Sequence, residues 1–315
     1  MIKEPLIIGK SRAIKEFFAF ARKAAKSDSN VVILGETGVG KELAAKMIHC
    51  LSHRKEKPFL KINCANLNDN LLESELFGHK KGAYTGAFFD KFGLIEEANQ
   101  GTFFFDEIAD ISFNIQAKLL GVIEDKEIRR IGENKGRKID VRFIFATNKN
   151  INDLVARNRF RQDLFYRISI LTFYIPPLRE RSEDINLLID KILDEKKTKM
   201  SFDFHITNEA INKLFKYSFP GNVRELENII KRACELSEHG VIREEDIYFQ
   251  EIQNKNVRIK RTRFKMSKII DALIKYQGNK TKVAKELGMS RTQLYRILNF
   301  EDEKNNKTKE ASSLT

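Results

Sequence analysis

The sequence GETGVGK, Gly35 to Lys41, constrains the fold of this chain more than any other feature. It directly follows the apolar run VVIL and precedes the helical pattern ELAAKMIHCL. A glycine-rich loop between a strand and a helix can turn backbone N–H groups toward a phosphate, and the helix N-terminus adds its positive dipole end. Lys41 can then bridge the β and γ phosphates of a nucleotide. The alternative is a turn-forming glycine loop with no ligand.

One position of this loop departs from the generic phosphate-binding motif. Glu42 stands where that motif has Ser or Thr, which removes the usual hydroxyl ligand for Mg²⁺. The residues predicted to bind ATP from this segment are Gly35, Glu36, Thr37, Gly38, Val39, Gly40, Lys41 and Glu42.

Apolar runs of strand length alternate with helical patterns through the first half of the chain. They are VVIL at 31–34, FLKI at 59–62, TFFF at 102–105 and VRFIFA at 141–146. This alternation is typical of an α/β fold with a mostly parallel sheet. We expect the strands to stop after Pro176 and Pro177, because residues 182–247 show mainly helical periodicity with one break at FPGN. That segment is predicted to be a small helical subdomain.

Two adjacent acids, Asp106 and Glu107, follow the run TFFF. The carboxyl end of a buried strand is where the loops of an α/β sheet gather around a ligand. We expect Asp106 to hold Mg²⁺ through water and Glu107 to polarise the water that attacks the γ phosphate. The alternative is a pair of solvated acids at a strand end.

Length and composition are those of a soluble protein of two or three domains. The chain has 315 residues, 42% hydrophobic and 32% charged. Its N-terminus lacks the pattern of a cleavable signal, and no run reaches about 18 apolar residues. Cys50, Cys64 and Cys234 are odd in number and far apart, which favours reduced thiols over a disulfide framework. We therefore expect a cytoplasmic protein with no membrane partner.

The positive charge is concentrated at one end. Of the net +13, an excess of +11 lies between Lys255 and Phe300, where 13 Lys and Arg face only Asp271 and Glu286. Such confinement favours a dedicated nucleic-acid module over a generally basic surface. The polar, basic segment 248–263 is the best candidate for a linker. A solvated basic tail is the alternative.

Residues 279–300 have the spacing of a helix-turn-helix. Val283, Ala284 and Leu287 would face inward from the first helix, a turn would fall at Gly288, and a second helix would follow. Its exposed face would offer donors suited to phosphates and base edges in a major groove. These candidate DNA-binding residues are Arg291, Thr292, Gln293, Tyr295 and Arg296. A generic three-helix interaction module is the alternative.

Six motifs, in this order, resemble the central domain of sigma-54-dependent transcription activators: GETGVGKE, ELFGHKKGAYTGA, GTFFFDEI, FRQDLFYRI, PPLRER and FPGNVREL. The basic end resembles the Fis-type domain of the same activators. The resemblance implies a ring-forming AAA+ ATPase. Its parts would be an α/β subdomain at 1–175, a helical lid at 176–247, the linker at 248–263, a Fis-type helix-turn-helix at 264–300 and a disordered tail at 301–315. Family members also have GKE in the phosphate loop, so Glu42 departs from the generic pattern but not from theirs.

The resemblance assigns further residues to the site. It implies that Thr147 and Asn148 sense the γ phosphate and that Asn63 can hold Glu107 in an inactive pose. Arg161 and Arg167 would be arginine fingers that reach the nucleotide of the neighbouring subunit, and Arg224 would contact the bound phosphates from the lid. A guanidinium delivered across an interface stabilises charge on the transferred phosphoryl group and couples hydrolysis to assembly, from dimer to ring hexamer.

The segment GHKKGAYTGAFFD, residues 78–90, has a Gly and Ala content that leaves little to bury, yet its Tyr84 and Phe88 are costly to expose, and such a segment suits a mobile loop with a partner. In the family the matching GAFTGA loop engages sigma-54. Only Tyr84, in place of Phe, departs from it. The residues predicted to contact sigma-54 are Gly82, Ala83, Tyr84, Thr85, Gly86 and Ala87.

The function implied is ATP-driven remodelling of a promoter complex that contains sigma-54 and RNA polymerase, by a protein bound to enhancer DNA. The predicted ATPase begins within about ten residues of Met1, so we expect no sensory domain of ~100 residues before it. Control would come from a separate regulatory protein acting in trans, from expression level, or not at all. Two alternatives stay open: a DNA-binding repressor with nucleotide-controlled oligomerisation, and an AAA+ remodeller of other substrates. A repressor has no need of the GAYTGA loop.

Overall fold

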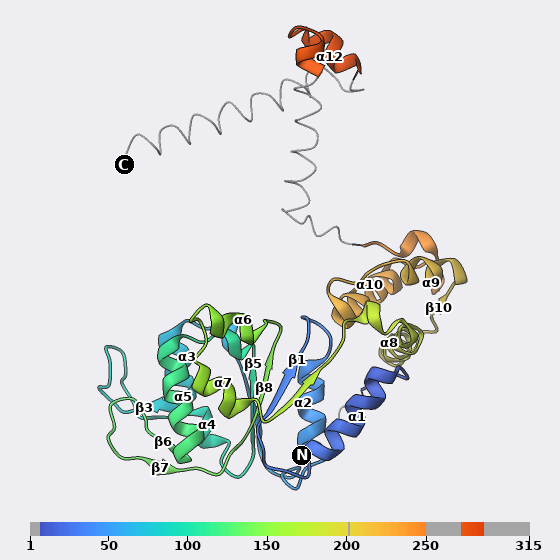
Figure 1. The fold of residues 1–315 in the computed structure, drawn as a ribbon. Helices are drawn as coiled ribbons and strands as arrows, with labels where there is room; N and C mark the ends of the chain where they lie inside the picture. Colours follow the sequence, from blue (N-terminus) through green and yellow to red (C-terminus); the bar gives the residue numbers. More distant parts are fainter. Residues whose placement is uncertain (1–6, 201, 250–271, 287–315) are drawn as a thin grey trace. The chain divides into compact units, whose positions relative to one another are not determined.

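A computed structural model describes residues 7–200, 202–249 and 272–286 of the chain (Figure 1). The chain divides into two compact units, Met1–Tyr248 and Phe249–Thr315. In the part that the structure describes, no helix is both long and apolar enough to cross a membrane.

The first unit is built on a five-stranded sheet of order β2-β5-β8-β1-β9, in which every neighbouring pair is parallel. This arrangement confirms the predicted α/β fold. Its strands are β1 (Val31–Leu34), β2 (Phe59–Asn63), β5 (Thr102–Asp106), β8 (Arg142–Thr147) and β9 (Leu171–Tyr174).

The edge strand β9 was not expected from the sequence. Its residues alternate between half-buried and exposed, because the strand pairs only with β1 and closes one side of the sheet. The pattern LTFY is therefore too weakly apolar to stand out beside the fully buried strand β8. The four predicted strands are present, and β8 begins at Arg142, one residue later than predicted.

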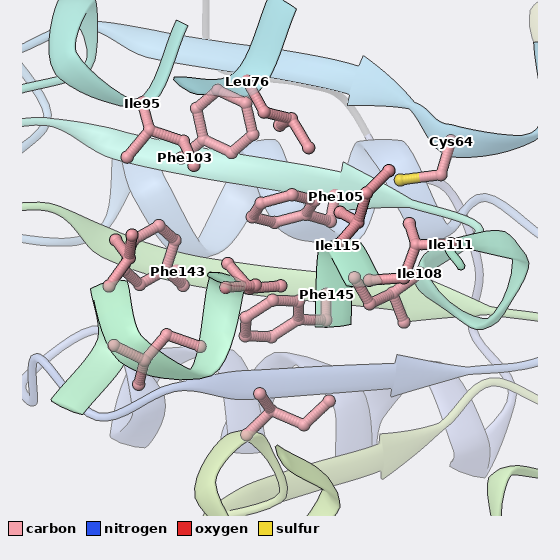
Figure 2. Close-up of a cluster of buried hydrophobic side chains, with 14 of the residues drawn as sticks. Cys64, Leu76, Ile95, Phe103, Phe105, Ile108, Ile111, Ile115, Phe143 and Phe145 are labelled. Atoms are coloured by element: carbon pink, nitrogen blue, oxygen red, sulfur yellow. The ribbon is translucent and has the colours of Figure 1, made fainter. Parts of the chain in front are cut away.

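Both faces of the sheet are covered, so its central strands are apolar on both sides. On β5 and β8, Phe103, Phe105, Phe143 and Phe145 point into one cluster, which also contains Ile115 from a covering helix (Figure 2). The residues between them on the strands, including Phe104, Ile144 and Ala146, pack on the opposite face against α1 and α2.

Helices lie on the two faces of the sheet and in a separate lid (Figure 1). On one face are α1 (Arg12–Ala24) and α2 (Lys41–Cys50); on the other are α3 (Asp69–Phe77), α4 (Leu94–Glu97), α5 (Phe113–Asp125) and α7 (Gln162–Ile168). Short elements fill the connections: α6 (Ile151–Ala156), the 3-10 turns η1 (Cys64–Asn66) and η2 (Ile108–Asp110), and the antiparallel pairs β3 (Gly78–His79) with β4 (Lys91–Phe92) and β6 (Glu127–Ile128) with β7 (Arg137–Lys138).

The lid is mainly helical, as predicted. It contains η3 (Leu178–Glu180), η4 (Ser182–Asp184), α8 (Ile185–Met200), α9 (Asn208–Phe215), α10 (Asn222–Leu236) and η5 (Glu244–Asp246). The expectation that strands stop after Pro177 is wrong in detail, because β10 (His205–Ile206) and β11 (Val241–Ile242) form a short parallel pair. Two-residue strands leave no periodicity in a sequence, and backbone pairing alone defines them.

In the second unit, the described residues include a helical stretch at 272–275, a turn at 276–278 and the helix α12 (Lys280–Glu286). Val283 is fully buried, as the helix-turn-helix pattern predicts. Ile274, in the preceding helical stretch, is 73% exposed. The expected turn at Gly288, the second helix and the tail lie outside the described residues, and so does most of the expected linker.

Candidate functional site

The glycine loop joins β1 to α2 at the carboxyl edge of the sheet. Gly40, in the left-handed region with φ of 105°, immediately precedes α2, and no side chain caps that helix. The first N–H groups of a helix have no partner within it, so they remain donors for an anion. The geometry therefore fits the phosphate binding that the sequence of this loop predicts.

Gly38 is constrained by the lid. Its φ is 82°, and a β-carbon at this position would lie 2.2 Å from the carbonyl oxygen of Gly221 at the start of α10. The carbonyl of Gly38 accepts from the backbone N–H groups of Val223 at 3.1 Å and Arg224 at 3.4 Å. The lid thus lies directly against the phosphate loop, with the backbone of Arg224 beside it. Contact of the Arg224 side chain with bound phosphates stays a prediction.

The side chain of Lys41 is buried at the centre of the site. Its Nζ donates to the carbonyl oxygens of Gly35 at 2.9 Å and Glu36 at 3.3 Å, and it lies 3.5 Å from Oε1 of Glu107. A single ammonium group therefore contacts both the glycine loop and Glu107.

The two acids lie at the end of β5 but take different directions. Asp106 ends the strand, and burial, followed by the charge of Glu107, raises its pKa. Glu107 adopts left-handed backbone angles, φ 53° and ψ 50°, which are uncommon for a residue with a side chain and recur at functional sites. Its Oε2 accepts from the backbone N–H of Asn148 at 3.0 Å.

Asn63 contacts Asp106 in this structure, whereas the resemblance implies contact with Glu107. Its Nδ2 lies 3.4 Å from Oδ2 of Asp106, because the two residues are paired in register across β2 and β5. The left-handed turn at Glu107 directs that side chain toward β8. Control of Glu107 by Asn63 stays a prediction.

Asn148 joins the phosphate loop to the acid pair. Its Nδ2 donates to Oγ1 of Thr37 at 2.9 Å, while its backbone N–H holds Glu107. The preceding Thr147 is buried, and its carbonyl accepts from the N–H of Gly35 at 3.3 Å. Both residues that were expected to sense the γ phosphate therefore lie beside the loop.

The donor set for Mg²⁺ is small. Among the described residues, no group of three or more His, Cys, Asp or Glu side chains could hold a metal ion. Glu42 is paired with Lys46 and Lys61 at 2.7 and 2.6 Å; burial raises its pKa, but the two lysines lower it further, so the net shift is downward. Mg²⁺ commonly binds through one or two carboxylates together with phosphate oxygens, which Asp106 and a nucleotide can provide.

A cavity of about 390 Å³ extends from the phosphate loop between α1 and the lid. Apolar side chains line most of it, including those of Ile7, Ile8, Leu43, Leu188, Ile192 and Val223. No pattern in the sequence points to these residues. Ile7 and Ile8 precede the first helix, and the others lie on helices whose apolar faces look like ordinary core. A cavity of this kind fits a flat, mostly apolar ring system such as a nucleotide base.

The two candidate arginine fingers lie at opposite ends of α7. Arg161 precedes the helix and donates to both oxygens of Asp163, at 3.0 and 2.7 Å. Arg167 is exposed near the helix end, where its carbonyl accepts from Asn30, the residue before β1. Because Asn30 is at the amino edge of the sheet, Arg167 lies at the edge opposite the phosphate loop of its own chain.

The segment 78–90 consists of β3 and the loop that joins β3 to β4. The hydroxyl of Tyr84 lies 3.4 Å from both Ser74 Oγ and His79 Nδ1, while Phe88 and Phe89 are 72% and 80% exposed. The loop also has a backbone partner that was not expected from the sequence. Ile131, between β6 and β7, exchanges backbone hydrogen bonds with Gly78 and Lys80 at 3.0 Å each. Gly132 and Gly136 within this short polar insert are the local signal for it.

The five candidate DNA-binding residues, from Arg291 to Arg296, lie outside the described part of the chain. Their contribution to a DNA-binding surface therefore stays a prediction.

The chain is similar to bacterial regulators over most of its length. It is 47% identical over 240 residues to the Nif-specific regulatory protein of Azorhizobium caulinodans, covering 76% of this chain and 39% of that protein. It is 39% identical over 303 residues to the regulatory protein AtoC of Escherichia coli K12, covering 91% and 66%. The chain spans about half the length of the curated relatives it matches.

Among solved structures, NtrX from Brucella abortus in complex with ATP aligns with a TM-score of 0.72 and 30% identity, covering 94% of this chain and 70% of that one. NtrX in complex with ADP aligns equally well, also at a TM-score of 0.72.

Three family profiles match in succession. The profile described as a bacterial regulatory protein of the Fis family matches residues 263–299, and the AAA+ ATPase lid domain matches residues 179–263. The profile described as the sigma-54 interaction domain matches residues 7–174, more than half of the chain. With the geometry of the phosphate loop and its acid pair, these matches show that the chain belongs to the sigma-54 interaction domain family.

Proposed function

We propose that this protein is a sigma-54-dependent transcription activator that hydrolyses ATP to convert a promoter complex of sigma-54 and RNA polymerase into the open form. The observation that carries the proposal is the meeting of Lys41, Glu107 and Asn148 at the glycine loop, on a domain that also presents the exposed segment 78–90. The names of the relatives, which are regulatory proteins, and the ATP and ADP complexes of NtrX support it.

The described residues suggest a division of labour in hydrolysis. The glycine loop and the N-terminus of α2 receive the phosphates, and Lys41 neutralises part of their charge. Glu107 positions and polarises the attacking water, while the N–H of Asn148 keeps its carboxylate in place. Bound Mg²⁺ would neutralise charge on the phosphates, and Asp106 would hold it through water.

The segment 78–90 is the proposed contact with sigma-54. Phe88 and Phe89 are costly to leave in water, and a partner that covers them recovers that cost. The loop is attached to the ATPase through β3, β4 and the backbone bonds with Ile131, away from the phosphate groups. A change at its tip should therefore leave the chemistry intact.

Assembly and DNA binding complete the proposal. Arg161 and Arg167 would act on the nucleotide of a neighbouring subunit in a ring hexamer that assembles from dimers. Residues 264–300 would bind enhancer DNA, as the Fis-family profile at 263–299 supports. A separate regulatory protein would act in trans.

Reconstituted transcription with sigma-54 polymerase tests this function. The unmodified chain should open an enhancer-bearing promoter only when ATP is present. Thr85→Ala should retain ATP binding, ring assembly and most ATPase activity, yet fail to open the promoter, because its change lies in the contact loop.

Glu107→Gln should bind ATP but hydrolyse it at least ~100-fold more slowly, the usual effect of losing a general base. A chain that ends before Lys255 should keep its ATPase and lose specific DNA binding.

Two results would contradict the proposal. Full promoter opening by Thr85→Ala, with normal sigma-54 binding in the presence of a transition-state mimic, would remove the loop from its assigned role. ATP hydrolysis that is stimulated by other proteins or by replication DNA, with no effect on sigma-54 promoters, would identify a different remodeller.

A further inference from the structure

The motif PPLRER, residues 176–181, follows β9 and leads into the lid, and we call it the connector. Its two arginines contact the phosphate loop. Arg179 donates two hydrogen bonds to the carboxylate of Glu36, the second residue of the loop: Nη1 to Oε2 at 2.9 Å and Nη2 to Oε1 at 2.7 Å. The hydrogen bonds from Arg179 lower the pKa of Glu36 most; burial raises it, and the hydrogen bond from Asn222 lowers it further, so the net shift is downward. The carboxylate is therefore ionised at neutral pH.

Asn222 reinforces this contact from the lid. It is fully buried at the first position of α10, with φ of 55°. Its Nδ2 donates to Oε2 of Glu36 at 3.1 Å and to the carbonyl of Thr37 at 3.0 Å, while its Oδ1 accepts from the N–H of Leu178 at 2.7 Å. One amide group thus joins the loop, the connector and the lid.

A third contact involves Arg181. Its guanidinium is buried, and Nη2 donates to the carbonyl of Val39 at 2.9 Å. Three residues of the phosphate loop, Glu36, Thr37 and Val39, are therefore held by side chains that lie more than 140 positions later in the chain.

The same loop is connected to the acid pair on its other side. Thr37 Oγ1 accepts from Asn148, and the backbone N–H of Asn148 holds Glu107. A displacement of Glu36 and Thr37 would therefore also shift Asn148 and, through it, Glu107, which is proposed to position the attacking water.

The charges at this position pose an electrostatic problem. Glu36 places a negative charge in a loop that must receive the phosphate groups of a nucleotide, and like charges in a shared site oppose binding. The two hydrogen bonds from Arg179 compensate that charge while they hold the loop against the connector.

We propose that Glu36 and Arg179 are positioning residues for nucleotide binding: Arg179 fixes the phosphate loop to the base of the lid through Glu36 and cancels the charge of that carboxylate. The carboxylate of Glu36 then acts through the loop and does not itself contact the nucleotide. This inference rests on the proposed ATPase function and assigns part of its binding step to PPLRER.

The proposal predicts an unusual pattern of mutant effects. Arg179→Gln leaves Glu36 charged and uncompensated beside the phosphates, so it should weaken MgATP binding by roughly 5-fold, and MgADP binding less because ADP carries less charge. Glu36→Gln keeps an acceptor for Asn222 and removes the repulsion, so its effect should be smaller. Adding Glu36→Gln to Arg179→Gln should restore part of the lost affinity.

The experiment measures dissociation constants for MgATP and MgADP by calorimetry on the full chain, together with KM and kcat. Arg179→Lys keeps the charge and should stay closer to the unmodified protein than Arg179→Gln. Thermal melting of each variant without nucleotide reports whether it is folded. Arg12→Gln, which breaks the exposed pair with Glu16 on α1, is the matched control and should leave both constants unchanged.

A double variant that binds MgATP as weakly as Arg179→Gln, or more weakly, would overturn the inference, since a purely structural contact loses affinity without recovery. Unchanged affinity in Arg179→Gln would also overturn it. If the unmodified chain binds MgATP with the predicted variant pattern but does not hydrolyse it, the proposed function fails and the inference stands. If the unmodified chain does not bind MgATP, both fail.

Discussion

At the scale of single residues, the site is built from side chains whose placement costs stability. Asp106 is partly buried beside Glu107, and its pKa is raised from the ordinary value of 3.8, first by burial and then by that neighbouring charge. Glu107 has left-handed backbone angles that residues with side chains seldom adopt. Such groups are retained where a reaction needs them, and their replacement commonly stabilises the protein.

Asp106→Asn should therefore raise the free energy of unfolding at neutral pH. Below pH 3.8 the carboxyl group is protonated in both states, so its ionisation gives no difference between the two proteins. As the pH rises above 3.8, the carboxyl group ionises more readily in the unfolded state, and the native protein with Asp106 loses stability relative to the variant.

Urea unfolding of both proteins from pH 3.5 to 7.5 checks this. Asp110→Asn is a suitable control, since that carboxylate is paired with Lys149. A stability difference that grows as the pH falls would contradict the burial argument.

At the scale of elements, the glycine loop and the start of α10 form one packed contact. Gly38 and Gly40 both have positive φ, but only Gly38 has a close neighbour, the carbonyl oxygen of Gly221. Nothing lies within 4 Å of the position that a β-carbon on Gly40 would take. A substitution at Gly40 therefore tests backbone strain alone, whereas one at Gly38 tests strain together with crowding against the lid.

Gly40→Ala should lower the free energy of unfolding by about 1–2 kcal/mol, the cost of a left-handed residue with a side chain. Gly38→Ala should lower it by a further ~1–3 kcal/mol, because the loop and α10 must also move apart. Urea unfolding without nucleotide measures both. Equal losses in the two variants would mean that the lid does not press on the loop in solution.

At the scale of the whole molecule, the arginines of α7 raise the question of assembly. Arg161, just before α7, hydrogen-bonds to Asp163 in the first turn of that helix, and Arg167 lies at the sheet edge opposite the phosphate loop. If Arg167 serves a nucleotide, we expect that nucleotide to belong to another subunit, and the same role for Arg161 stays a prediction; the ATPase should then depend on the assembled state.

Mixing Arg161→Ala chains with Lys41→Ala chains should restore ATPase activity that neither variant has alone. At equal amounts, about a quarter of the interfaces in randomly mixed rings would combine an intact phosphate loop with an intact neighbouring arginine. The control mixes Lys41→Ala with Glu107→Gln, two changes in the same site, and should recover nothing. Mixed rings that form but stay inactive would count against action in trans.

The sequence by itself determined the features that depend on neighbouring residues. The phosphate loop, the two acids after TFFF and four of the five sheet strands follow from local periodicity and from glycines at fixed spacing. These patterns were sufficient for the family resemblance that the profile matches at residues 7–174 and 263–299 bear out.

The tertiary structure decided which distant side chains meet. Strand register pairs Asn63 with Asp106 and not with Glu107, and no local pattern encodes register between strands some forty residues apart. The connector after β9 brings Arg179 to Glu36 across 143 positions, and the docking of α10 places Asn222 against Thr37. The apolar cavity beside the loop likewise exists only once the lid has packed, because its walls come from α2, the N-terminal segment and the lid, which meet only in the folded chain.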